Sequence, residues 1–68
     1  LYWRIFMSES FSEIAIRLGA EKIVAGINWT WANGFKTRES AEEFCKTPNI
    51  ETRGVYDGAG GTFDVRFR

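Results

Sequence analysis

The chain has 68 residues with 9 basic and 9 acidic side chains, so its net charge at pH 7 is zero and gives no reason to expect a polyanionic partner. One Cys and no His exclude an intramolecular disulfide and argue against zinc sites and His-based catalysis. We expect a single small domain over residues 1–68, with a core built from its 6 Phe, 3 Trp and 2 Tyr.

Residues 1–7 (LYWRIFM) alternate in the manner of a strand, and one set of alternate side chains is apolar. The other set is Tyr2, Arg4 and Phe6, two aromatic rings on either side of an arginine. That combination is unusual for a solvated sheet face, so this face is a candidate for binding.

Residues 8–19 predict a helix, because apolar residues recur from Phe11 at i, i+3, i+4 and i+7. Ser10 and Glu13 have the spacing of a capping box, in which each side chain accepts a backbone N–H at the helix start. Ser8 is a competing N-cap residue.

Residues 23–37 (IVAGINWTWANGFKT) predict a half-buried central strand over residues 23–31, which Asn33 and Gly34 break before a helix begins at Thr37. The alternation places these residues on one face: Ile23, Ala25, Ile27, Trp29 and Trp31. We expect Trp29 and Trp31 to belong to the core, although two indoles on one strand can also form a platform for a sugar or a proline-rich peptide. A break near Gly26 or Asn28 would instead split the strand into a hairpin.

The second half of the chain predicts a helix and a hairpin. Thr37 is the expected N-cap of a helix over residues 38–46, on which Cys45 is a core position. Residues 50–56 and 62–68 predict two strands, and the Gly-rich stretch 57–61 between them is typical of a hairpin turn.

These elements predict a small α+β fold: a four-stranded, mostly antiparallel sheet with two helices on one face, in the order β-α-β-α-β-β. Splitting residues 23–37 would give β-α-β-β-α-β with an extra strand, which is a ferredoxin-like variant. Both orders stay open at this stage.

Residues 34–44 (GFKTRESAEEF) resemble the strand-to-helix joint of peptidoglycan-binding SPOR domains and of the arm-binding domains of phage integrases. The shared pattern is Phe-x-Thr-x-x-x-Ala. It consists mainly of a helix N-cap and one core position, and we assign no family from it.

The candidate interface is the sheet face turned away from the helices. Its expected members are Tyr2, Arg4, Phe6, Arg53, Arg66 and Arg68, with Trp29 and Trp31 as weaker candidates. Arginine and aromatic residues are enriched in protein interfaces, and they also suit single-stranded nucleic acid, where rings stack on bases. The alternative is an ordinary solvated face that binds nothing, on which Glu51 and Asp64 neutralise the arginines.

From these residues we expect a non-catalytic module that binds a partner protein, or another copy of itself, through its sheet face or an edge strand. The alternative is a single-stranded nucleic-acid-binding module. We expect no cofactor, no metal and no membrane span, and one lone Cys favours a cytoplasmic protein. The first residue is Leu1 and the last lies in an expected strand, which suggests a chain cut from a longer one.

Overall fold

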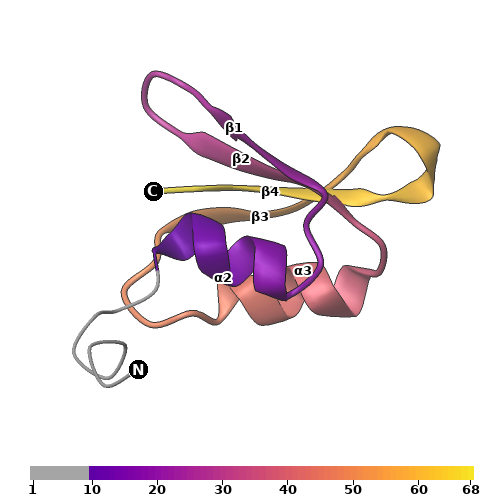
Figure 1. The fold of residues 1–68 in the computed structure, drawn as a ribbon, viewed down its shortest axis with the longest axis horizontal. Helices are drawn as coiled ribbons and strands as arrows, with labels where there is room; N and C mark the ends of the chain where they lie inside the picture. The colour runs from indigo at the N-terminus through magenta and orange to yellow at the C-terminus, as the bar shows by residue number, and fades with distance from the viewer. Residues whose placement is uncertain (1–9) are drawn as a thin grey trace.

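The computed structural model describes residues 10–68, so the prediction of a strand over residues 1–7 lies outside the described part. The described chain forms two layers, a sheet and a pair of helices (Figure 1). In chain order its elements are α2 (Phe11–Arg17), β1 (Lys22–Ala25), β2 (Thr30–Phe35), α3 (Arg38–Cys45), β3 (Thr52–Asp57), the 3₁₀ turn η1 (Ala59–Gly61) and β4 (Phe63–Phe67).

The sheet has four strands in the order β1-β2-β4-β3, and every neighbouring pair is antiparallel. It is built from two hairpins, β1–β2 and β3–β4, that pair through their second strands. Figure 1 shows both helices on the same side of this sheet. The predicted α+β architecture is therefore confirmed.

The prediction of one long strand over residues 23–31 is wrong, and so is the predicted break at Asn33 and Gly34, because both residues lie within β2. The chain turns back after Ala25, and β1 pairs with β2 so that Ile23 faces Ala32. A Cβ atom at Gly26 would overlap the carbonyl oxygen of Trp29, so the tight return of the backbone depends on glycine there. The break near Gly26 or Asn28 is confirmed, and residues 10–68 follow the order α-β-β-α-β-β.

Both helices begin where the sequence predicts. The Ser10 hydroxyl accepts the Glu13 N–H, and the Glu13 carboxylate accepts the Ser10 N–H, which completes the capping box. Thr37 caps α3 by accepting the N–H of Ser40 at 3.1 Å. These caps satisfy backbone donors that have no partner within the helix.

The core lies between the helices and the sheet. Phe44 of α3 packs against Phe35 of β2 and Phe67 of β4, with ring centroids 5.7 and 5.1 Å apart, and Phe11 of α2 lies 6.3 Å from Phe67. The buried alanines let the helices approach the sheet closely: Ala15, Ala20, Ala32 and Ala41. Cys45 is half-buried and packs against this core, as expected.

Among residues 10–68, no helix is long and apolar enough to cross a membrane. Helices α2 and α3 have 7 and 8 residues.

Candidate functional site: an arginine–aromatic sheet face

The two faces of the sheet are identified by their cross-strand partners. Ile23 faces Ala32 and Ala32 faces Val65, and all three belong to the core or pack against it. Because side chains alternate along a strand, their neighbours lie on the opposite face, which we call the open face. This face is turned away from α2 and α3 (Figure 1).

The open face carries a row of side chains that crosses the sheet. Val24 of β1 faces Trp31 of β2, and Trp31 faces Arg66 of β4. Towards the end of the sheet where the β1–β2 loop lies, Arg68 pairs with Glu51 through two backbone hydrogen bonds. These pairings bring Trp31, Arg66 and Arg68 together from separate parts of the sequence.

A bulge in β3 adds Arg53 to this face. The pairing of β3 with β4 shifts between Thr52 and Val55, so Arg53 and Gly54 both lie opposite Arg66. Gly54 has a φ of +86°, a conformation that favours glycine. The extra residue lets Val55 return to the core and turns Tyr56, the partner of Asp64, to the open face.

Six side chains gather here, and we call them the arginine–aromatic cluster: Trp29, Trp31, Arg53, Tyr56, Arg66 and Arg68. Three guanidinium groups surround the Trp29 ring, with Arg68 4.2 Å and Arg53 and Arg66 each 5.4 Å from its centroid. Such contacts are attractive because the face of an indole ring is electronegative.

Arg66 is the centre of the cluster. Its guanidinium lies 5.4 Å from the Tyr56 ring and 5.8 Å from the Trp31 ring, and the two rings are 5.4 Å apart. It donates a hydrogen bond to the Tyr56 hydroxyl at 3.1 Å, while its buried Nε has no hydrogen-bond partner among the described residues. The Arg66 side chain therefore lies close to both rings and has no carboxylate partner in residues 10–68.

Arg68 does have an acidic partner. Its Nε and Nη2 donate to the two carboxylate oxygens of Glu51 at 3.2 and 3.4 Å. The hydrogen bond from Arg68 lowers the pKa of Glu51, desolvation opposes this, and the charges of Arg68 and Arg53 lower the pKa further. Within residues 10–68, Glu51 is the only carboxylate in an ion pair with this cluster.

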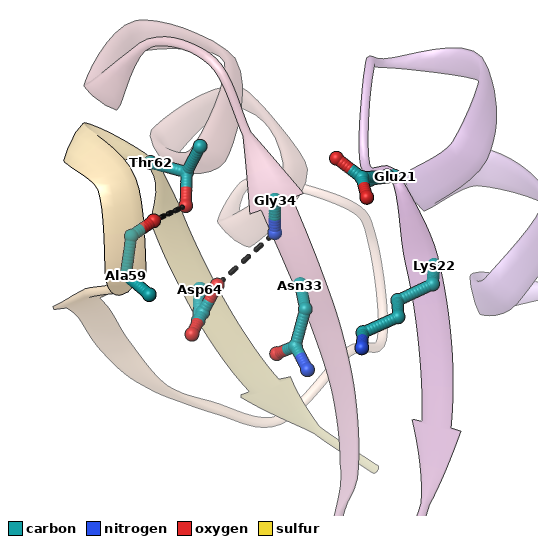
Figure 2. Close-up of a pocket in the computed structure, with 7 residues that line it drawn as sticks. All are labelled: Glu21, Lys22, Asn33, Gly34, Ala59, Thr62 and Asp64. Atoms are coloured by element: carbon teal, nitrogen blue, oxygen red, sulfur yellow. Dashed lines mark hydrogen bonds between the residues drawn. The ribbon is translucent and has the colours of Figure 1, made fainter.

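A polar pocket of about 280 Å³ lies at the other end of the open face. Figure 2 shows Asn33 between Asp64 and Lys22, with Glu21 beyond, and the Oδ1 of Asn33 is buried without a hydrogen-bond partner among the described residues. The Asp64 carboxylate accepts the Gly34 N–H at 3.0 Å, so one of its oxygens is already used within the sheet. The pocket carries groups of both signs and is open to solvent.

The structure places most predicted site residues together. Arg53, Arg66 and Arg68 share the open face, whereas Tyr2, Arg4 and Phe6 lie outside the described part of the chain. The prediction that Trp29 and Trp31 belong to the core is wrong: both are only half-buried and lie against the arginines. Hairpin formation reverses the expected alternation, since Trp29 lies in the β1–β2 loop and Trp31 follows the register of β2.

Tyr56 is the cluster residue that sequence reasoning missed. Strict alternation from Arg53 would point Tyr56 into the core, and the bulge at Gly54 reverses its direction. A glycine inside a predicted strand is a known signal for a bulge and could have suggested this.

The other candidates from the sequence show no ligand site. No group of three or more His, Cys, Asp or Glu residues that could hold a metal ion occurs in residues 10–68. Glu39, Glu42 and Glu43 of α3 are exposed to solvent. The glycine run forms the turn η1 between β3 and β4, as predicted for a hairpin connection.

The comparisons found no matching family model, no matching curated protein and no matching solved structure. The function is therefore argued from the open face alone.

Proposed function

We propose that this domain is a non-catalytic module that binds a partner protein through its open face. The observation that supports this is the arginine–aromatic cluster itself, in which three guanidinium groups and three aromatic rings share one face of the sheet. Trp, Tyr and Arg are the residue types that contribute most to binding energy at protein interfaces. Trp29, Trp31, Tyr56 and Arg66 are half-buried here before any partner is bound, which reduces the entropy lost on binding.

The apolar part of the open face supports the same proposal. Val24, next to Trp31, is 42% exposed, and Ile27 at the tip of the β1–β2 loop is fully exposed. An apolar border beside ordered arginines resembles the mixed composition of a protein interface more than that of a solvated surface.

A single-stranded nucleic acid is the second candidate, favoured by the fact that Arg53 and Arg66 have no acidic partner in residues 10–68. Base stacking needs free aromatic faces, however, and guanidinium groups already lie against the rings of Trp29, Trp31 and Tyr56. We therefore place the protein partner first.

A non-catalytic role fits the chemistry of this face. Glu51 is held ionised by Arg68, and a carboxylate with a lowered pKa is a poor general base at neutral pH. Arginine side chains serve for recognition of anions rather than for proton transfer.

The test uses the double change Arg66→Glu and Arg68→Glu, which reverses the charge of the cluster. A matched control, Lys36→Glu with Lys46→Glu, makes the same change of charge at exposed positions in the β2–α3 connection and after α3. Light scattering over a range of concentrations and at two salt levels measures self-association. Affinity capture from an extract of the source organism, followed by titration of the purified protein that is captured, measures binding of a foreign partner.

The proposal expects that wild-type protein and the control bind the same partner and that the cluster variant does not. Binding that survives the cluster change would contradict it. The other outcome is that a single-stranded oligonucleotide binds instead of a protein. If that binding weakens steeply with salt and is lost only in the Arg66→Glu, Arg68→Glu variant, nucleic-acid binding replaces protein binding as the proposed function.

A further inference from the structure

The open face is chemically asymmetric from one edge to the other. Its central row runs from Val24 through Trp31 to Arg66, and Arg53 lies beyond Arg66 on β3. Neighbouring strands are about 4.8 Å apart, so the backbones of β1 and β4, which carry Val24 and Arg66, are about 10 Å apart. A ligand that covers this row meets an apolar strip on one side and a cationic strip on the other.

The cationic strip has positive charge that the described chain does not neutralise. Arg68 is paired with Glu51, but neither Arg53 nor Arg66 forms an ion pair in residues 10–68. Arg53 is exposed, but Arg66 is half-buried, where an unpaired charge is unfavourable and a carboxylate supplied from outside would relieve it. Arg66 uses one Nη2 hydrogen bond on the Tyr56 hydroxyl, and a guanidinium carries further N–H groups that a carboxylate can accept.

We propose that the partner docks an amphipathic acidic helix on the open face, a proposal that rests on the protein-binding function above. Its apolar side would pack on Val24 and Trp31, and its carboxylates would bind Arg66 and Arg53. A helix with its side chains is about 10–12 Å wide, which matches the distance between the two strips. Ile27, in the loop that follows β1, is fully exposed and offers further apolar surface to a partner.

The acidic helix of a second copy does not fit this surface. Helix α3 carries Glu39, Glu42 and Glu43, but its apolar side chains Ala41 and Phe44 are fully buried in the core of its own domain. It could offer carboxylates without the apolar side that Val24 and Trp31 require. Helix α3 of a second copy is therefore not the occupant, and the helix we propose belongs to a different protein.

The probe is a synthetic peptide of about 18 residues, with Leu at helical i, i+3, i+4 and i+7 spacing and Glu at the flanking positions. Its matched control replaces every Glu with Gln. We expect the Glu peptide to bind wild-type protein, to gain helical circular dichroism on binding, and to bind at least tenfold more tightly than the Gln peptide. Arg66→Gln and Arg53→Gln should each weaken binding of the Glu peptide by about tenfold, because each removes a charge-assisted contact.

Val24→Asp tests the apolar strip at an exposed position where the change should not disturb folding, and it should weaken binding by a similar factor. Lys36→Gln is the charge control and should leave the affinity unchanged. Amide NMR spectra of each variant establish that it is folded.

Equal affinity for the Glu and Gln peptides, or no loss in folded Arg66→Gln, would overturn the acidic-helix proposal. If no peptide binds while a captured partner still depends on Arg66 and Arg68, the acidic helix is wrong and the protein-binding function stands. If no peptide binds and no captured partner depends on Arg66 and Arg68, both proposals are overturned. If a single-stranded oligonucleotide binds more tightly than the peptide, and this binding is lost in the same variants, the open face binds nucleic acid through its phosphates.

Discussion

Asp64 and Gly34 are joined by a hydrogen bond that completes the sheet at a bulge. The pairing of β2 with β4 shifts between Ala32 and Phe35, which leaves two residues of β2 opposite Asp64. The carboxylate Oδ1 of Asp64 accepts the N–H of Gly34 at 3.0 Å and so gives a partner to a backbone donor within this bulge. Gly34 itself has a φ of +86°.

Gly34→Ala should destabilise the domain by about 2–4 kcal/mol, since it combines backbone strain with a steric clash. A Cβ atom at this position would lie 2.6 Å from the Cβ of Glu21. Urea denaturation followed by Trp fluorescence measures the change. In a double-mutant cycle, Glu21→Gly should recover only the steric part of the loss, and full recovery would show that backbone strain is absent.

Asp64→Ala should cost about 1–3 kcal/mol, because the Gly34 N–H would lose its acceptor in a part-buried position. Asp64→Asn should cost less, since its side-chain carbonyl can still accept the hydrogen bond. Amide hydrogen exchange at Gly34 should speed up in the Ala variant. Unchanged exchange in Asp64→Ala would contradict the role given to this carboxylate.

Gly54→Ala separates strain from crowding at the second bulge. Gly54 also has a φ of +86°, but a Cβ there would meet no atom within 4 Å. We expect a loss of about 1–2 kcal/mol from the conformation alone, and a smaller loss for Gly54→Asn, because Asn tolerates positive φ. If Gly54→Ala costs as much as Gly34→Ala, the steric part of the argument at Gly34 is wrong.

These two glycines also explain which parts of the fold could be predicted from the sequence and which could not. Both helices, their caps and the β3–β4 hairpin depend on local signals, such as the Ser10–Glu13 pair and the glycine run after Asp57, and each was predictable. The strand faces depend on register, which one extra residue reverses. Counting alternate residues through Gly54 therefore places Tyr56 on the wrong face of the sheet.

The strand prediction within residues 23–37 was wrong for a related reason. Alternating apolar residues continue through Gly26 without interruption, so periodicity alone describes one strand where the chain makes two. Only the tertiary pairing of Val24 with Trp31 shows that the second Trp belongs beside Arg66. Arg66 and Arg68 were predictable because β4 is regular, and Arg53 because strand alternation from Thr52 reaches it before the bulge takes effect, whereas the aromatic partners were not.

The Glu51–Arg68 ion pair should make the domain sensitive to acid. Glu51 has a lowered pKa in the folded state, chiefly through its hydrogen bond with Arg68, so ionised Glu51 stabilises the fold. This stabilisation is fully present above the pKa that Glu51 has in the unfolded chain. It is lost as the pH falls through the lower, folded-state pKa. The side chain of Glu51 is 54% exposed, so solvent screens the pair and the effect should be small.

An NMR titration of the Glu51 side-chain carbonyl group should give a midpoint below the ordinary value for glutamate. In Arg68→Gln the midpoint should return towards that value, because the main hydrogen-bond donor is lost, and in Arg53→Gln it should move less, since Arg53 acts only through its charge. High salt should raise the midpoint in the wild-type protein. A midpoint that is the same in Arg68→Gln and wild type would mean that the ion pair does not persist in solution, and the guanidinium of Arg68 would then be as free as those of Arg53 and Arg66 to bind a partner's carboxylate.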